Sequence, residues 1–242
     1  MTPRSRALLP FAPYAVVSAV HVVALFLELP IHAPTKLLLM PALALGALWA
    51  AARPVPGLLG ERGTRGAIVL LVAAIAFSWL GDGAATFFPM FDDELPMMLL
   101  CFGLAHVRYV LLMWRADGVA VRRFPAWALV YVGAYAALMA LLVPHTGSLT
   151  VPVMIYGLLL VATAAVASRC GAVIAWGGAW FLVSDAILAF RIFVPEVMPA
   201  WTSGAVMLTY TLGQGLIVAG IVAALRRRRA AAVTPAAASA AS

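Results

Sequence analysis

The stretch Phe77-Ser78-Trp79-Leu80-Gly81-Asp82-Gly83 places an ionisable carboxylate inside an apolar run that is long enough to cross a membrane. A carboxylate at bilayer depth costs about 2.5–3.5 kcal/mol even on lenient insertion scales, so such a residue faces a polar interior and has partners. The surrounding run predicts a membrane helix over residues 66–88. Asp82 therefore indicates a polar site inside a bundle of membrane helices.

The composition of the whole chain supports this interpretation. Of its 242 residues, 65% are hydrophobic and 10% are charged, whereas soluble domains contain about half apolar and about a quarter charged residues. The net charge of +7 comes from basic residues in short gaps between apolar runs, so they are topology signals and do not indicate nucleic-acid binding. Cys101 and Cys170 lie in different apolar segments near opposite membrane faces, and we expect no disulfide.

Apolar runs divide the chain into eight expected membrane spans. Runs of about 18–23 apolar residues can cross a hydrocarbon core of ~30 Å, and eight are present, at 11–29, 35–52, 66–88, 95–114, 125–143, 150–168, 171–193 and 203–225. The first run lacks a signal-peptide cleavage site and is expected to be a retained helix. The sequence predicts an all-α, polytopic domain over residues 1–229, followed by a disordered Ala/Ser-rich tail at 230–242.

The placement of basic residues predicts the orientation of the bundle. With eight spans, the arginines between and beyond the spans fall on one side of the membrane, and the opposite loops carry acidic residues such as Asp92, Asp93 and Glu94. Because Lys and Arg accumulate on the cytoplasmic side, we expect both termini to be cytoplasmic, in a multi-pass protein of the cell membrane.

Two acids lie at similar depth within the expected spans. Asp82 is in the outer part of the third span and Asp185 in the outer half of the seventh, which indicates one shared site. Other polar residues inside the spans are candidate supporting residues: Lys36, His106, Tyr109, Tyr210 and Gln214.

Each supporting residue also has an ordinary structural explanation. Lys36 lies at a span end, where lysine commonly extends to the interface. Tyr109 and Tyr210 fit ordinary packing with a hydrogen-bonded hydroxyl. His106 fits a neutral imidazole bonded to a carbonyl, and Gln214 fits an interhelical hydrogen bond. For the two aspartates a structural role is less expected, because carboxylates in spans are rare.

This set of residues suits acid–base chemistry or ion movement. Burial favours the protonated form of one carboxylate and a nearby cation favours the charged form of another. The same residues suit binding of a translocated proton or cation. Zinc chemistry is less expected because His21 and His106 are the only histidines inside the spans. An intramembrane aspartyl protease would need glycine where Trp79 stands.

Five short motifs resemble the YhhN-like lysoplasmalogenase family. They occur in the family's order from the second to the eighth span: Thr35-Lys36-Leu37-Leu38-Leu39-Met40-Pro41, Ser78-Trp79-Leu80-Gly81-Asp82, Gly103-Leu104-Ala105-His106-Val107-Arg108-Tyr109, Gly178-Ala179-Trp180-Phe181-Leu182-Val183-Ser184-Asp185 and Tyr210-Thr211-Leu212-Gly213-Gln214. Leu37 departs from the pattern, because many relatives carry proline after the lysine. The resemblance implies hydrolysis of the vinyl-ether bond of lysoplasmalogens to a fatty aldehyde and a glycerophospho-headgroup.

The implied reaction suits the candidate residues. Vinyl-ether hydrolysis needs a strong acid, a nearby negative charge and an oriented water. We expect one of Asp82 and Asp185 to be the acid and the other the stabilising carboxylate, with the order open. Lys36 holds a carboxylate ionised or contacts the lipid phosphate, while His106, Tyr109 and Gln214 position water or substrate.

The expected partners are therefore a lysophospholipid substrate and membrane lipids, with no cofactor, no metal and no nucleic acid. Two other classes of function stay open at this point. One is a proton- or cation-coupled transporter of small molecules, and the other is a non-catalytic lipid-binding membrane protein.

Overall fold

The computed structural model describes residues 8–53, 57–121 and 123–239. All regular secondary structure in these ranges is helical. The α-helices are α2 Ala12–Phe26, α3 His32–Ala52, α4 Arg62–Asp82, α5 Ala84–Phe87, α6 Leu95–Arg115, α7 Val130–Leu142, α8 Thr150–Ala167, α9 Ala172–Phe193 and α10 Thr202–Ser239. Short 3₁₀ turns lie at Leu9–Phe11, Ala126–Leu129, Val143–His145, Gly147–Leu149 and Pro195–Val197.

Eight helical segments in the described ranges are long and apolar enough to cross a membrane. They coincide with the eight predicted spans, so the all-α, multi-pass architecture is confirmed. The third span is shorter than predicted: α4 ends at Asp82 and Gly83 separates it from the short helix α5. A Cβ atom at Gly83 would lie 2.5 Å from the ring of Phe87 and 2.8 Å from the side chain of Leu37, so the close packing at this helix end leaves little room for a side chain. Asp82 is therefore the last residue of its helix.

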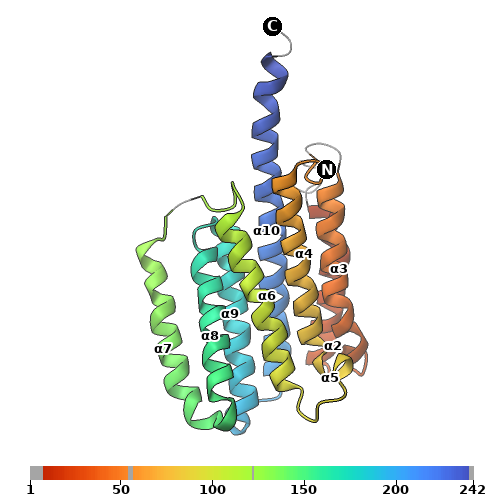
Figure 1. Cartoon of the computed structure of the whole chain (residues 1–242). Helices are drawn as coiled ribbons and strands as arrows, with labels where there is room; N and C mark the ends of the chain where they lie inside the picture. The colour runs from red at the N-terminus through yellow and green to blue at the C-terminus, as the bar shows by residue number, and fades with distance from the viewer. Residues whose placement is uncertain (1–7, 54–56, 122, 240–242) are drawn as a thin grey trace.

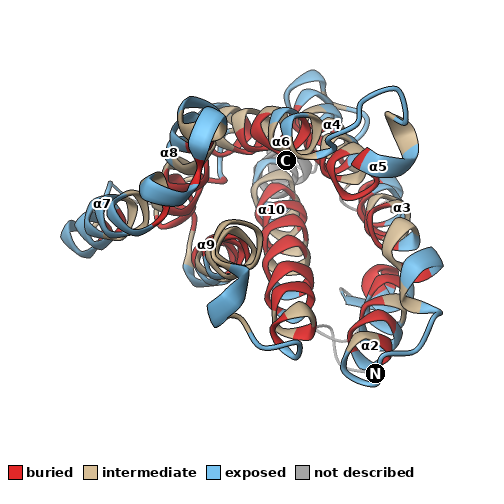
Figure 2. Ribbon diagram, turned by 90° about the horizontal axis from the view of Figure 1, so that it is seen from below, coloured by how far each residue is buried: buried red, intermediate tan, exposed pale blue. Residues whose placement is uncertain are grey.

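The helices form a bundle with α10 at its centre. Seen along the bundle, α10 is buried on most sides, whereas α7 lies at the periphery with an exposed surface (Figure 2). Many large apolar side chains on the outer helix surfaces are exposed, for example Val16, Leu45 and Leu129. An apolar outer surface is what a bundle in lipid requires.

Glycines bring α9 and α10 into backbone contact. A Cβ atom at Gly177 of α9 would lie 2.7 Å from the backbone nitrogen of Ile217, and one at Gly213 of α10 would lie 2.8 Å from that of Phe181. Small residues allow this close approach in membrane helices, where van der Waals packing is a main source of association. The contact fixes α9, which carries Asp185, against the helix that carries Tyr210.

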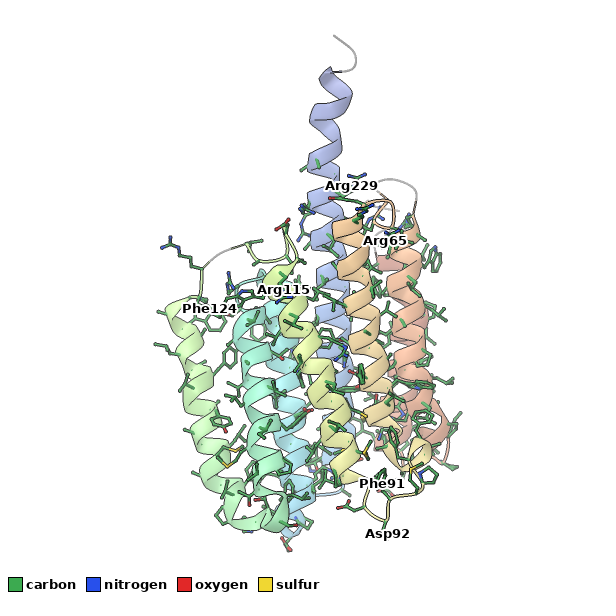
Figure 3. All side chains as sticks on the ribbon, in the orientation of Figure 1. Arg65, Phe91, Asp92, Arg115, Phe124 and Arg229 are labelled. Carbon is green, nitrogen blue, oxygen red and sulfur yellow. The ribbon has the colours of Figure 1, made fainter. Side chains whose placement is uncertain are left out.

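The two ends of the bundle differ in charge. Arg65, Arg115 and Arg229 lie at one end and Asp92 at the other (Figure 3). This separation agrees with the pattern from which we predicted orientation, although the side of the membrane on which the termini lie stays a prediction. Cys101 and Cys170 are both buried and unbridged.

The last helix is longer than the sequence predicts. α10 continues beyond the bundle (Figure 1), and its backbone is helical to Ser239, whereas a disordered tail was expected over 230–242. Alanine has the highest helix propensity of all residues, which explains why an Ala-rich segment extends the preceding helix. Residues 240–242 lie outside the described ranges.

Candidate active site

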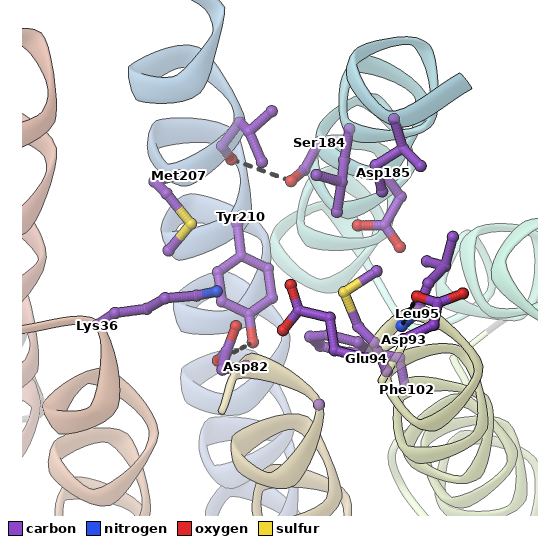
Figure 4. A pocket seen from close by; sticks show the side chains of 15 residues that line it. Lys36, Asp82, Asp93, Glu94, Leu95, Phe102, Ser184, Asp185, Met207 and Tyr210 are labelled. Carbon is purple, nitrogen blue, oxygen red and sulfur yellow. Dashed lines mark hydrogen bonds between the residues drawn. The ribbon is translucent and has the colours of Figure 1, made fainter. Parts of the chain in front are cut away.

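A cavity of about 390 Å³ lies at the end of the bundle that carries the loop of Asp92, opposite Arg65, Arg115 and Arg229. Its walls come from α3, α4, α6, α9 and α10, and four of the predicted site residues line it (Figure 4): Lys36, Asp82, Asp185 and Tyr210. Both carboxylates are 9% exposed. The structure therefore brings the two acids onto one cavity.

Two further cavities adjoin the first. One of about 420 Å³ extends toward α2 and shares Lys36 and Asp82 with it. The other, of about 50 Å³, lies among α6, α8 and α9, shares Asp185, and is otherwise lined by apolar residues and Tyr156. Asp82 thus also faces a cavity lined by Lys36 and Arg191, whereas Asp185 also faces an apolar one.

Asp82 stands where its own helix disfavours a negative charge. The C-terminus of an α-helix carries a partial negative charge, and Asp82 is the final residue of α4. The hydroxyl of Tyr210 donates a hydrogen bond of 2.8 Å to its Oδ2 atom. Figure 4 shows Lys36 extended toward the same side of the cavity. A hydrogen-bond donor and a cation therefore compensate the position of Asp82.

Gln214 and Tyr109, two of the predicted site residues, form a hydrogen-bonded chain with Tyr210 outside the cavity lining. The side-chain nitrogen of Gln214 contacts the Tyr210 hydroxyl at 3.5 Å and donates to the hydroxyl of Ser78 at 3.0 Å. The Tyr109 hydroxyl donates to Oε1 of Gln214 at 2.6 Å. Gln214 and Tyr109 are fully buried and do not line the cavity. Their contacts fix the orientation of Tyr210 and do not reach the substrate space.

Asp185 has a different set of partners, which sequence reasoning missed in part. The hydroxyl of Tyr156, on α8, lies in hydrogen-bond contact with Oδ2 of Asp185. The same hydroxyl lies 3.5 Å from Nε2 of His106, whose Nδ1 lies 3.0 Å from the hydroxyl of Thr163. His106 is fully buried behind Tyr156, so it contacts Asp185 only through that tyrosine.

A proline in α3 leaves a backbone carbonyl next to Lys36 free to bond to α4. Pro41 has no backbone N–H, so the carbonyl of Leu37, four residues earlier, lacks its usual helical donor. The indole N–H of Trp79 supplies the donor at 2.9 Å. This bond ties α3 beside Lys36 to α4 three residues before Asp82. Trp79 therefore has a structural role in joining the two halves of the site.

Acidic residues from the loop before α6 complete the cavity mouth. Glu94 and Asp93 line the main cavity, and Glu94 also lines the neighbouring one. The carboxylate of Glu94 accepts a hydrogen bond from the backbone of Ala85 at 3.1 Å, and that of Asp93 accepts one from Leu95 at 2.9 Å. The sequence identified these acids only as loop residues, because nothing in it shows that the loop folds over the site.

The two carboxylates on this cavity have different hydrogen-bond partners. In the part of the chain that the structure describes, no three His, Cys, Asp or Glu side chains gather as a metal site. The two carboxylates differ in their partners, and such a difference is how one site obtains both an acid and a base.

The sequence model of the YhhN family matches residues 31–221, which include every residue placed at the site above. No match was found among curated proteins or among solved structures. The family match covers most of the chain and all helices from α3 to the central part of α10. The chain therefore belongs to the YhhN family.

Proposed function

We propose that this protein is a lysoplasmalogenase-type hydrolase that cleaves the vinyl-ether bond of a lysophospholipid. The products are a fatty aldehyde and a glycerophospho-headgroup. Membership of the YhhN family supports the class of reaction. The observation that carries the proposal is the presence of two buried carboxylates, Asp82 and Asp185, on one cavity with different partners.

The reaction requires an acid and a carboxylate in turn. The acid protonates the alkenyl carbon that is not bonded to oxygen, and the positive charge then resides on the other alkenyl carbon and the ether oxygen. Water adds to that carbon and gives one proton to the carboxylate, which forms a hemiacetal. In the last step the hemiacetal hydroxyl loses its proton and becomes the aldehyde C=O, the bond between that carbon and the glycerol oxygen breaks, and the glycerol oxygen gains a proton.

Two carboxyl groups are sufficient for the whole cycle. The group that lost its proton in the first step takes the hydroxyl proton in the last step. The group that took a proton from water gives it to the glycerol oxygen. Both groups then return to their starting protonation states, and the net change is the consumption of one water. General acid–base catalysis of this kind contributes about 10²–10⁴-fold in rate for each group.

The cavity walls suit a single-chain lipid. Apolar side chains on α6 and α9 line the space next to Asp185, for example Met98, Phe102 and Leu188. Lys36 lies on the opposite side, where a cation stabilises a carboxylate or binds a lipid phosphate. An alkenyl chain on the apolar side and a headgroup on the polar side would place the ether bond between the two acids.

The test is aldehyde release from a defined lysoplasmalogen by the purified protein. We expect turnover by the unmodified chain and a loss of at least about 10²-fold in Asp82→Asn and in Asp185→Asn. The matched control is Asp92→Asn, the same change in an exposed loop residue, which should keep full activity. Full activity in both cavity variants, with folding preserved, would refute the two-acid mechanism.

Flux across liposomes and lipid binding, measured beside aldehyde release, separate the other classes of function. Buried carboxylates in membrane spans also form proton and cation pathways. A transporter would move solute or protons across liposomes without consuming lipid. A lipid-binding protein would bind lysolipid saturably and release no aldehyde.

A further inference from the structure

We infer that Asp185 carries the catalytic proton, that Asp82 is the carboxylate, and that Tyr156 and His106 are positioning residues that hold this proton on Asp185. The inference rests on the proposed function and assigns roles that the reaction alone leaves open. It follows from counting the protons available to each hydrogen bond around the two acids.

Thr163 lies next to His106, on the side of Asp185. Its hydroxyl donates its single proton to the carbonyl of Leu159 at 2.9 Å. The contact between Nδ1 of His106 and the Thr163 oxygen must therefore use the proton of the imidazole. A neutral imidazole has one N–H, so Nε2 of His106 is an acceptor that points to the Tyr156 hydroxyl.

Tyr156 has one hydroxyl proton for two neighbours. If Asp185 is ionised, the proton of Tyr156 goes to the carboxylate, and the buried Nε2 of His106 is left without a donor. If Asp185 is protonated, its O–H donates to the tyrosine oxygen, and the tyrosine proton goes to His106. Only the protonated form of Asp185 satisfies both contacts, and buried polar atoms are rarely left without a hydrogen-bond partner.

The hydrogen bonds around Asp82 can all form without a proton on its carboxyl group. Oε1 of Gln214 accepts from Tyr109, so its two amide protons are left for Ser78 and Tyr210. The oxygen of Tyr210 therefore receives an amide proton, and its own proton goes to Asp82. A protonated Oδ2 on Asp82 would compete with that amide for the tyrosine oxygen. On this side every contact is satisfied when Oδ2 of Asp82 only accepts, so the hydrogen bonds do not call for a proton on Asp82 as they do on Asp185.

The surroundings of the two acids favour the same assignment. Lys36 lines both cavities that contain Asp82, and Arg191 lines the second of them. The other acid that lines both, Glu94, is an exposed loop residue. The small cavity beside Asp185 is lined mainly by aliphatic and aromatic side chains. Apart from Asp185, Tyr156 carries the polar group among its lining residues. A carboxyl group in apolar surroundings favours its neutral form, and a carboxyl group near a cation favours its charged form.

Tyr156 also accommodates the change in Asp185 during the reaction. When Asp185 gives its proton to the substrate, the new carboxylate needs a donor. The Tyr156 hydroxyl then turns its proton from His106 to Asp185, a rotation about one bond. The proton that returns to Asp185 in hemiacetal collapse reverses this rotation. A tyrosine between an acid and a neutral imidazole therefore supports both states of the acid.

The test is infrared spectroscopy of the purified protein without lipid, at neutral pH. A protonated carboxyl group shows a C=O stretch that a carboxylate lacks. We expect this band in the unmodified protein and in Asp82→Asn, and its loss in Asp185→Asn. Loss in Asp82→Asn with retention in Asp185→Asn would overturn the assignment, as would absence of the band from the unmodified protein.

A matched pair of tyrosine variants keeps the test decisive if an aspartate variant does not fold. Tyr156→Phe removes the hydroxyl at Asp185, and Tyr210→Phe removes the one at Asp82. The band should shift in Tyr156→Phe and stay in place in Tyr210→Phe. A band that responds to Tyr210→Phe alone would refute the inference. A purely structural role of Tyr156 would leave the band unchanged.

The spectroscopic result is independent of the proposed reaction. If the band behaves as expected and no aldehyde forms from lysoplasmalogen, the proton assignment stands and the proposed function fails. If aldehyde forms and the band follows Asp82, the function stands and the assignment fails. In an active protein, Tyr156→Phe should lower kcat by about tenfold to a hundredfold with little change in KM.

Discussion

The backbone contact between α9 and α10 makes Gly213→Ala an informative perturbation. A Cβ atom there would lie 2.8 Å from the backbone nitrogen and 3.0 Å from the Cα atom of Phe181. Both atoms belong to the backbone, so no flexible side chain can move away. The two helices must therefore separate by several tenths of an ångström. This separation also moves Asp185 on α9 away from Tyr210 on α10.

The size of the effect follows from comparison with Gly133→Ala. Gly133 lies on the exposed surface of α7, and a Cβ atom there meets nothing within 4 Å. Both changes gain the same helix propensity, about 1 kcal/mol, so this gain cancels between the variants. The difference that remains is the cost of overpacking, about 1–3 kcal/mol.

The assay is thermal unfolding of both variants in the same detergent, with aldehyde release measured in parallel. At about 2–4 °C per kcal/mol for a chain of this size, Gly213→Ala should unfold about 2–12 °C below Gly133→Ala. Its turnover should also fall, because the two halves of the site move apart. An equal or higher Tm in Gly213→Ala would refute the close packing on which the site geometry depends.

Three further changes have distinct expected results. Trp79→Phe leaves the carbonyl of Leu37 without its donor, so Tm should fall by an amount equivalent to about 1–2 kcal/mol. Tyr210→Phe removes a hydrogen bond to a carboxylate and should lower kcat/KM by about tenfold to a hundredfold. The control Tyr135→Phe loses only an exposed hydrogen bond to the carbonyl of Met154, and its activity should match that of the unmodified chain. Arg228→Ala breaks two partly exposed ion pairs and should change stability by at most about 1 kcal/mol, with activity unchanged; a large loss of activity would contradict a site confined to the opposite end.

The architecture was predictable because the bilayer fixes the length of each span. Runs of apolar residues of the required length correspond to helices throughout the described ranges. The shared position of Asp82 and Asp185 followed from the cost of a carboxylate in a membrane. The apolar run predicts a third span that ends at residue 88, whereas α4 ends at Asp82, and Gly83 is the residue in the sequence that signals this end.

The partners of the acids were less accessible to sequence reasoning. Tyr156 lies in α8, whose other residues are mostly apolar. A single tyrosine in such a helix commonly packs against neighbouring helices and has no further role. Its role depends on how α8 crosses α9, which only the folded structure shows. Pro41 indicated that the carbonyl of Leu37 lacks a helical donor, but no sequence pattern identified Trp79, a residue 42 positions later, as the donor.

The most direct test of the central claim is hydrolysis of a defined lysoplasmalogen by the purified protein in D₂O. Protonation of the alkenyl carbon would place one deuterium on the carbon next to the aldehyde group, and mass spectrometry of the rapidly trapped aldehyde would detect it. We predict singly deuterated aldehyde from the unmodified chain and none above background from Asp185→Asn. Unlabelled aldehyde, or equal labelled product from Asp185→Asn, would contradict acid catalysis at this site.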